Sequence, residues 1–581
     1  MAIGGNSDGK AGGLSFHTRL VCVAFLLYFA AAALSANIGR FSDLTAWLLF
    51  AQDRWLLLAE ALVLAAATIA LRPGGRPLTL SPRLCHLLAL SLIPLCYLGH
   101  IWPLCGYDMS RDEQMAVFDA RIFAHGLLAQ PLPAAWQTHT DALNSLFLLP
   151  AAHPIAWVSA YLPVNAALRA LVGLAVDPNW TSPILTAIGA IALWNCARRL
   201  WPDNAEAPTV ALLLYLTSGQ VLFAGMTAYA MAAHLTFNLL WLWLFLIGRR
   251  WSDCAALIVG ALATGLHQPL FHPMFAGPFI LVLLGRRAWG RAACFILGYA
   301  VICGFWLSWP HLIYARIEGA HPSAVPLDAD FWARLRAVLD DEPEARWTDM
   351  AANLLRFIGW QPILLLPLFI AGFATGIAVA RRDAMPIALA GATLLPLIVA
   401  TILMPDQGQG FGYRYLHGVI GSAILVALYG WNHLVELEAR WRPLLGRTLV
   451  GGALAFLPMQ ALMTYAYQQS AAMVEARVAS SGADYIIIGN DDAPESGGLV
   501  INRADLSNRP LRLFADKVDP DLTHLMCARR ATVALPTGGF YAPINRYFSG
   551  TLISLAADRR IWGLGRQLRQ AGCDVRVIGG A

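Results

Sequence analysis

The chain has 581 residues, of which 58% are hydrophobic and 13% are charged. A charged share this far below the roughly 25% usual for soluble domains excludes an ordinary soluble protein and predicts a polytopic membrane protein. The formal net charge is only +5, and the Arg residues form short clusters between apolar runs. That pattern is typical of membrane topology and argues against a nucleic-acid partner.

Apolar runs long enough to span a membrane predict about thirteen transmembrane helices. They lie near residues 18–36, 55–71, 84–104, 181–200, 207–225, 230–248, 253–267, 274–286, 291–309, 360–380, 384–403, 415–432 and 447–466. The Arg clusters fall in alternate loops, which places those loops in the cytoplasm. The loops at 105–180, 226–230, 267–273, 310–359 and 404–414 then face outward, together with the C-terminal tail. In the long first loop, Pro-interrupted apolar stretches at 143–176 predict helices lying along the membrane surface.

The composition changes near residue 467. Ala483–Ile488 and Ala531–Leu535 have the character of buried strands, and residues 560–571 that of a helix. We therefore expect a transmembrane domain over 1–466, with the periplasmic loop 105–180, and a small soluble periplasmic α/β domain over 467–581. Cys527 and Cys573 are the cysteines of this tail and can form a disulfide if it is periplasmic.

Ser110-Arg111-Asp112-Glu113 follows a hydrophobic span at the mouth of the first long loop. A carboxylate at a membrane boundary is costly unless it is solvated, paired or functional, so Asp112 is a candidate catalytic group. Ser110 and Glu113 also fit a capping box at the start of a helix over about 111–128. That alternative accounts for Glu113 and leaves Asp112 unexplained.

The other outward loops collect further candidate groups. Arg414 lies in a Gly-rich turn, where backbone N–H groups and a guanidinium suit a phosphate; the alternative is an Arg that snorkels to the interface. His267 fits either a phosphate partner or a structural cap of a broken helix. A zinc site with His272 is not expected at a spacing of five. Asp406 fits either a carboxylate for substrate hydroxyls or a turn initiator. The expected substrate- or donor-binding residues are Glu113, Arg121, Tyr161, His267, Gln268, Tyr413 and Arg414, with Asp119, His125 and Asn165 nearby.

Several of these segments resemble the GT-C glycosyltransferases. The resemblance is carried by the Asp-Glu pair in the first large outward loop, by Ala120-Arg121-Ile122-Phe123-Ala124-His125-Gly126, by Tyr161-Leu162-Pro163-Val164, and by the helix from Ile184 to Arg199. Within that superfamily the chain is most similar to bacterial relatives of protein O-mannosyltransferases and of the lipid A aminoarabinose transferase. The similarity covers about residues 84–310 well and the later spans loosely.

The resemblance implies a polyprenyl-phosphate sugar donor and transfer of a hexosyl or pentosyl group on the periplasmic side of a bacterial inner membrane. It also implies that Asp112 is the catalytic carboxylate. The chain departs from the family where relatives often carry Lys or Arg in the short fourth outward loop, because His267 and Gln268 stand there. That departure shifts the expected phosphate contact to Arg414. Two spans precede the span before the acidic pair, where relatives typically have one.

The chemistry expected from these residues is a metal-independent, inverting single displacement. A carboxylate can take the proton of an acceptor hydroxyl, and a phosphate leaving group needs positive charge rather than a general acid. No cofactor is expected, and the partners are membrane lipid, the lipid-linked donor and a glycan, lipid or protein acceptor. The alternatives are a transporter or flippase of lipid-linked sugars, and an envelope polysaccharide polymerase.

Overall fold

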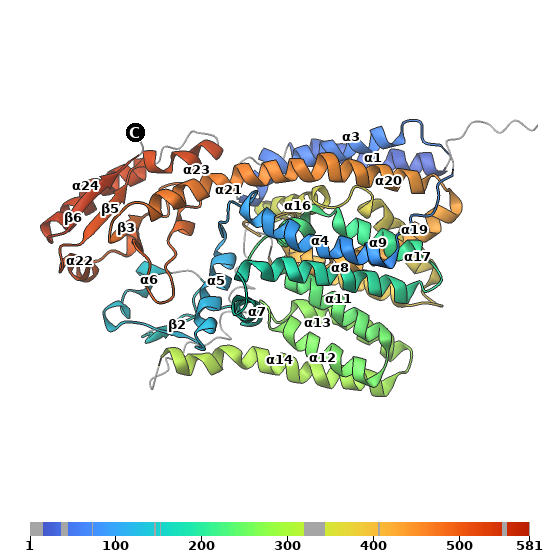
Figure 1. Ribbon diagram of the computed structural model, residues 1–581, viewed down its shortest axis with the longest axis horizontal. Helices are drawn as coiled ribbons and strands as arrows, with labels where there is room; N and C mark the ends of the chain where they lie inside the picture. The colour runs from blue at the N-terminus through green and yellow to red at the C-terminus, as the bar shows by residue number, and fades with distance from the viewer. Residues whose placement is uncertain are drawn as a thin grey trace, which may run out of the picture.

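The computed structural model describes residues 16–36, 44–72, 74–144, 147–151, 153–318, 343–404, 407–548 and 555–579, and within these not the side chains of 343–346, 555 and 556. Most of the described chain is a bundle of apolar helices that run roughly along one axis (Figure 1). A small α/β unit lies at one end of this bundle and contains the end of the chain.

Most of the bundle helices follow the predicted apolar runs, whereas the helices Leu44–Leu48 and Pro343–Gly359 lie outside those runs. The bundle helices are α1 (Phe16–Ser35), α2 (Leu44–Leu48), α3 (Arg54–Thr68), α4 (Pro82–Ile101), α8 (Thr181–Leu200), α9 (Glu206–Leu216), α10 (Gly219–Ala224), α11 (Met231–Ile247), α12 (Arg250–Thr264), α13 (Phe271–Gly285), α14 (Trp289–Ile317), α16 (Pro343–Gly359), α17 (Leu365–Val379), α18 (Met385–Leu403), α19 (Ile420–Leu437), α20 (Trp441–Gly451) and α21 (Leu457–Ala479).

Six helical segments in the described part of the chain are both long and apolar enough to cross a membrane. They begin at Phe16, Pro82, Trp289, Met385, Arg414 and Trp441, and shorter apolar helices such as α11 and α13 pack among them. The chain is therefore a polytopic helical membrane protein. The number of spans, about thirteen by sequence, stays a prediction.

Two predicted runs differ from the observed helices. The run at 207–225 is divided into α9 and α10, because the Ser218 hydroxyl accepts the Val221 N–H and caps a new helix. The last run is longer than expected: α20 continues through a π-helical turn, Gly452–Phe456, into α21, which reaches Ala479 and enters the α/β unit.

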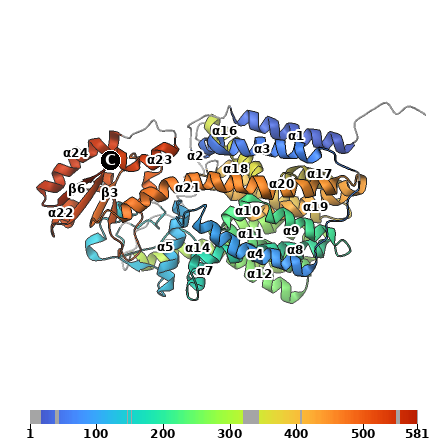
Figure 2. The same ribbon diagram turned by 45° about the horizontal axis from the view of Figure 1, so that its top comes forward.

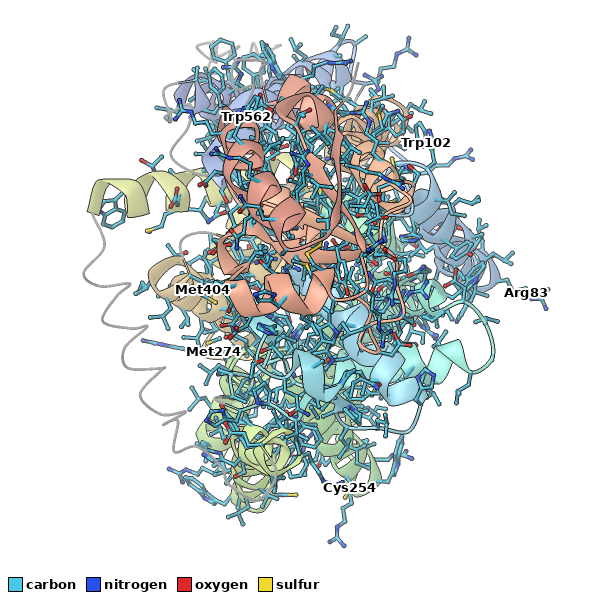
Figure 3. All side chains as sticks on the ribbon, turned by 90° about the vertical axis from the view of Figure 1, so that its left-hand side faces the viewer. Arg83, Trp102, Cys254, Met274, Met404 and Trp562 are labelled. Atoms are coloured by element: carbon cyan, nitrogen blue, oxygen red, sulfur yellow. A yellow bond between two sulfur atoms is a disulfide. The ribbon has the colours of Figure 1, made fainter. Side chains whose placement is uncertain are left out.

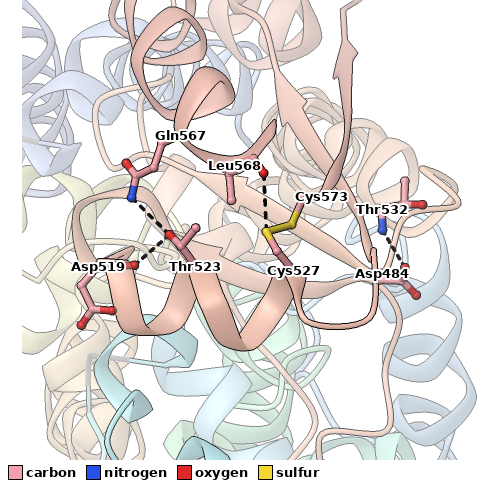
Figure 4. The surroundings of a disulfide bond; sticks show 8 residues. All are labelled: Asp484, Asp519, Thr523, Cys527, Thr532, Gln567, Leu568 and Cys573. Atoms are coloured by element: carbon pink, nitrogen blue, oxygen red, sulfur yellow. Dashed lines mark hydrogen bonds between the residues drawn. A yellow bond between two sulfur atoms is a disulfide. The ribbon is translucent and has the colours of Figure 1, made fainter. Parts of the chain in front are cut away.

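The α/β unit has a four-stranded parallel sheet of order β4-β3-β5-β6. The strands are β3 (Tyr485–Ile488), β4 (Leu511–Phe514), β5 (Thr532–Pro536) and β6 (Asp574–Ile578), and the helices are α22 (Pro520–Cys527), α23 (Ala542–Tyr547) and α24 (Leu555–Gln570). The predicted strands and the predicted helix correspond to β3, β5 and α24. The disulfide between Cys527 and Cys573 is present and joins the ends of α22 and α24, beside the Gln567–Thr523 hydrogen bond of 3.2 Å (Figure 4).

The first long loop packs between this unit and the bundle. It contains α5 (Arg111–Ala124), α6 (Thr140–Leu143), α7 (Val164–Gly173) and a two-stranded antiparallel pair, β1 (Gln130–Pro131) with β2 (Ala156–Trp157). Met115, Phe118 and Trp157 of the loop share one apolar core with Ile487 and Leu513 of the sheet. Figures 1 and 2 both show α5 between the sheet and the ends of the bundle helices.

Polar contacts also connect the α/β unit to α5. Arg111 donates from its two terminal nitrogens to the carbonyls of Val500 (2.8 Å) and Gly497 (2.6 Å), and Gln114 donates to that of Gly498 (2.9 Å). Figure 3 views the molecule from the end that carries the α/β unit. Trp562 of α24 lies at this surface and is 75% exposed.

Candidate functional site

The first turn of α5 is fixed by the predicted capping box. The Ser110 hydroxyl accepts the Glu113 N–H at 3.2 Å, and a Glu113 carboxylate oxygen accepts the Ser110 N–H at 3.3 Å. The other carboxylate oxygen accepts the Ala228 N–H at 3.2 Å. Burial, and then the nearby charge of Asp108, raise the pKa of Glu113 to about 8. The capping prediction is confirmed, and these contacts give Glu113 a structural role, while its expected substrate contact stays a prediction.

Asp112 projects from the same turn and meets Arg414, 302 residues later in the chain. A terminal guanidinium nitrogen of Arg414 donates to one Asp112 oxygen, and the Tyr161 hydroxyl donates to the other. The Asp112 and Arg414 side chains are each 14% exposed. Three predicted site residues, which the sequence offered as separate candidates, thus form one contact.

The protonation states follow from this contact. Burial acts to raise the pKa of Asp112, but the charge of Arg414 and the hydrogen bonds from Tyr161 and Arg414 outweigh burial and hold the pKa below its ordinary value. Asp112 is therefore a carboxylate at neutral pH. Burial and the Asp112 charge raise the pKa of Tyr161, so its hydroxyl remains a donor. Burial lowers the pKa of His267, which keeps that ring neutral.

Aromatic side chains surround the Arg414 guanidinium. Its central carbon lies 5.1 Å from the ring centroid of Tyr415 and 5.6 Å from that of Tyr229, within the range of cation–π attraction. One terminal nitrogen also donates to the Tyr415 hydroxyl at 3.3 Å. The ring of His267 lies 4.5 Å from that of Tyr161. These aromatic contacts restrain the side chains of Arg414 and Tyr161, the two groups that donate to Asp112.

Two small cavities adjoin the Asp112–Arg414 pair and share His267 and Met231. The first is lined by Met231, His234, Asn238, His267, Phe271, Pro396, Arg414, Tyr415, Gly418 and Val419. The second is lined by Asp112, Ala116, Asp119, Ser159, Tyr161, Leu162, Asn165, Ala166, Tyr229, Ala230, Met231, Leu266 and His267. The cation therefore faces one cavity and the carboxylate the other, which we call the Arg414 cavity and the Asp112 cavity.

Asp119 is a second carboxyl group in the Asp112 cavity. It lies seven residues after Asp112, two helical turns along the same face of α5. It accepts the Ser159 N–H at 3.0 Å and the Ser159 hydroxyl. Burial raises its pKa to about 7, although the two hydrogen bonds from Ser159 act against the rise.

The Gly-rich turn before Arg414 is held by buried amides. Gln220 donates to the Tyr413 carbonyl at 2.7 Å, and Gln407 accepts the Arg414 N–H at 2.8 Å. Gly412 has a φ of +63°, and a Cβ there would lie 2.3 Å from the Gln220 side-chain oxygen, so the turn requires glycine. The position of Arg414 thus depends on the residue types of the turn.

The turn is also tied to the N-terminal helices. Arg356 of α16 donates to the Gly410 carbonyl at 2.6 Å and to Asp53 at 2.7 Å, and this ion pair is almost completely buried. The segment of the chain before α4 therefore contributes to the placement of the site.

Several predicted site residues lie elsewhere. Arg121 is exposed and near Arg503 and Asp505, because nine residues along a helix turn its side chain to the face opposite Asp112. Gln268 follows His267 but is not among the residues lining the two cavities. Tyr413 is 1% exposed and also lines neither cavity. The predicted binding role of these three residues stays a prediction, and they lie outside the lining of the two cavities.

The structure also places most of the other residues that the sequence analysis named. Asn165 lines the Asp112 cavity and donates to the Ala228 carbonyl, whereas His125 is exposed at the end of α5. His272 is bound to Asn238 and Tyr299 at 2.7 Å each. Asp406 lies outside the described residues.

The sequence analysis missed His234, Tyr229 and Tyr415. Tyr229 lies just before α11, and His234 lies in its first turn. An imidazole inside an apolar run is a signal in the sequence that indicates a functional site. Tyr415 directly follows Arg414, and its ring stacks near Phe271 with a centroid distance of 6.1 Å. Tyr415, which follows the predicted anion ligand Arg414, lines the Arg414 cavity, whereas Tyr413, which precedes it, does not.

No protein-family model matches the chain, and no curated protein matches it. Solved structures to which it is similar include ArnT from Cupriavidus metallidurans bound to undecaprenyl phosphate, with 13% identity and a TM-score of 0.47 over 71% of this chain and 84% of that one. The apo state of the same protein gives 14% identity and a TM-score of 0.36 over 71% and 83% of the two chains. ArnT is a lipid A aminoarabinose transferase, the kind of protein that the sequence was expected to resemble. Similarity at this level assigns no function to the chain.

Proposed function

We propose that the chain is an integral membrane glycosyltransferase that moves a hexosyl or pentosyl group from a polyprenyl-phosphate donor to a lipid, glycan or protein acceptor. The observation that carries this proposal is the contact of Asp112 with Arg414 and Tyr161 between two small cavities. Transfer of a sugar from a phosphate leaving group requires a base for the acceptor hydroxyl and a cation for the phosphate. Asp112 and Arg414 offer these two groups side by side.

Asp112 is the general base. An acceptor hydroxyl in the Asp112 cavity transfers its proton to the carboxylate as its oxygen attacks the anomeric carbon of the donor. The bond from that carbon to the phosphate oxygen breaks, and polyprenyl phosphate leaves with the electron pair. Attack opposite to the leaving group inverts the anomeric configuration, and the reaction is complete in one displacement without a metal ion.

Arg414 binds the donor phosphate. The guanidinium offers a planar fork of N–H donors that fits two phosphate oxygens. In the structure this fork contacts Asp112, so a phosphate that engages Arg414 competes with Asp112 for it. Loss of the ion pair with Arg414 raises the proton affinity of Asp112, which makes the carboxylate a better base once the donor is bound.

The site faces the periplasm in this proposal. The loops that contain the Arg clusters are assigned to the cytoplasm, and the 105–180 loop is then on the other side of the membrane. The Cys527–Cys573 disulfide supports the same side for the α/β unit, since disulfides persist in oxidising compartments. We assign the protein to a bacterial inner membrane.

The proposal is tested by mass spectrometry of the lipid-linked and envelope glycans from cells with and without the gene. Loss of one glycan modification is expected on deletion, together with accumulation of its polyprenyl-phosphate sugar. A copy encoding the wild-type chain should restore the modification, whereas Asp112→Asn should not. Unchanged glycans and unchanged donor levels in the deletion strain would contradict the proposal.

A further inference from the structure

His234 is a buried imidazole whose ring nitrogens have no hydrogen-bond partner among the described residues. It lies in the first turn of α11 and is 8% exposed, and neither ring nitrogen has a partner within the described part of the chain. His272 offers a contrast at similar burial, because Asn238 and Tyr299 occupy both of its ring nitrogens at 2.7 Å. Burial without a partner is unfavourable for a polar group unless a ligand supplies the missing hydrogen bonds.

His234 lines the Arg414 cavity beside the groups that a ligand would meet. The cavity combines one cation, Arg414, with the neutral polar side chains of His234, His267 and Asn238. The rings of Phe271 and Tyr415 add apolar faces, and the Phe271 ring lies 5.9 Å from that of His234. A single charge beside neutral hydrogen-bonding groups and aromatic faces matches a phosphate joined to a neutral sugar.

Gly418 lets the Arg414 segment approach α11 closely. A Cβ at Gly418 would lie 3.2 Å from the His234 Cβ and 3.3 Å from the Asn238 amide nitrogen. Asn238 donates to the Gly418 carbonyl at 2.8 Å. The spacing between His234 and the segment that carries Arg414 is therefore set by the close packing at Gly418 and by the hydrogen bond from the Asn238 side chain.

We propose that His234 is a sugar-binding residue that hydrogen-bonds hydroxyl groups of the donor monosaccharide while Arg414 binds the donor phosphate. This inference rests on the proposed function and adds the residue that distinguishes a glycosylated lipid from the bare lipid phosphate. A neutral imidazole has one donor and one acceptor nitrogen. Hydroxyl groups satisfy both, whereas a phosphate oxygen only accepts.

The test measures lipid binding to the purified full-length chain in nanodiscs. The probes are undecaprenyl phosphate and undecaprenyl phosphate carrying mannose, glucose or 4-amino-4-deoxyarabinose. The wild type is expected to bind at least one sugar-bearing lipid more tightly than undecaprenyl phosphate. His234→Phe should weaken binding of that lipid by about tenfold, the value of roughly one hydrogen bond, and leave undecaprenyl phosphate unchanged.

Two further variants control for indirect effects. His433→Phe makes the same chemical change at an exposed position of α19 that lines neither of the two cavities, and it should bind every probe like the wild type. His234→Gln keeps a donor and an acceptor and should retain part of the preference for the sugar-bearing lipid.

Each other outcome is informative. His234→Phe that keeps the wild-type preference would overturn the sugar-binding role and leave the proposed function standing. An equal loss for both kinds of lipid would also overturn it, because the effect would then come from the phosphate contact or from the fold. A wild type that binds none of the probes would contradict the proposed function itself.

Discussion

Asp112→Asn separates the two roles assigned to the Asp112–Arg414 contact. The amide keeps the size of the side chain and an oxygen for the Tyr161 hydroxyl, but it carries no charge and cannot accept a proton. General-base catalysis typically contributes about 10²–10⁴-fold, which corresponds to about 2.7–5.5 kcal/mol of barrier. We expect kcat to fall by that amount.

Donor binding should respond in the opposite direction. In the wild type, Arg414 is paired with Asp112 when no donor is bound, and both side chains are largely buried. Asp112→Asn removes the competing charge, so the donor phosphate no longer displaces a carboxylate from Arg414. The Kd for the donor is therefore expected to stay equal or to decrease, while turnover is lost.

The assay compares single-turnover transfer and donor binding for the wild type, Asp112→Asn and Glu113→Gln. Glu113→Gln is the neighbouring control, because it keeps one acceptor for the capping box and leaves the Ser110 or the Ala228 N–H unpaired. A buried donor left unpaired costs about 1–3 kcal/mol of stability, with little expected effect on the chemical step. Wild-type turnover in Asp112→Asn, or equal and modest losses in both variants, would refute the assignment of Asp112 as the base.

Three further changes test other parts of the proposed mechanism. Arg414→Ala should weaken use of the donor more than Arg414→Lys. The acidic limb of the kcat/KM pH profile, which reports the donor-free enzyme, should move to higher pH in Arg414→Ala, because loss of the Arg414 charge raises the pKa of Asp112. The shift should be smaller in Arg414→Lys, which keeps the charge, and an unmoved limb in Arg414→Ala would exclude that coupling. Cys573→Ala opens a loop of 46 residues and should lower the stability of the α/β unit by about 4 kcal/mol, measured by denaturant unfolding against Cys254→Ala, an exposed cysteine without a disulfide partner. A periplasm-dependent reporter fused after Ala581 should be active, and activity of a cytoplasm-dependent reporter there would reverse the topology.

Local signals in the sequence predicted the local structure well. Ser110 and Glu113 are three residues apart, and that spacing alone defines the capping box that the structure contains. The apolar runs likewise predicted most of the bundle helices, because a membrane requires long uninterrupted apolar segments.

Features that depend on distant contacts were harder to predict. β4 was missed because Arg512 interrupts its apolar pattern, yet Arg512 is accommodated there by an ion pair with Glu475 of α21. Asp112 and Arg414 are 302 residues apart, so neither helical nor strand periodicity in the sequence relates them. Arg121 lies on another face of α5 than Asp112, because proximity in sequence does not ensure a shared helical face.

Reconstituted transfer tests the central claim most directly. The purified chain in nanodiscs is given undecaprenyl-phosphate sugars and an envelope fraction as acceptor, and the sugar product and free undecaprenyl phosphate are quantified together. We expect the sugar product and undecaprenyl phosphate to form in equal amounts, with inversion at the anomeric carbon. Both should be lost when Asp112→Asn replaces the wild type. Movement of the intact lipid-linked sugar across a proteoliposome membrane, with no release of undecaprenyl phosphate, would contradict a transferase and indicate a transporter.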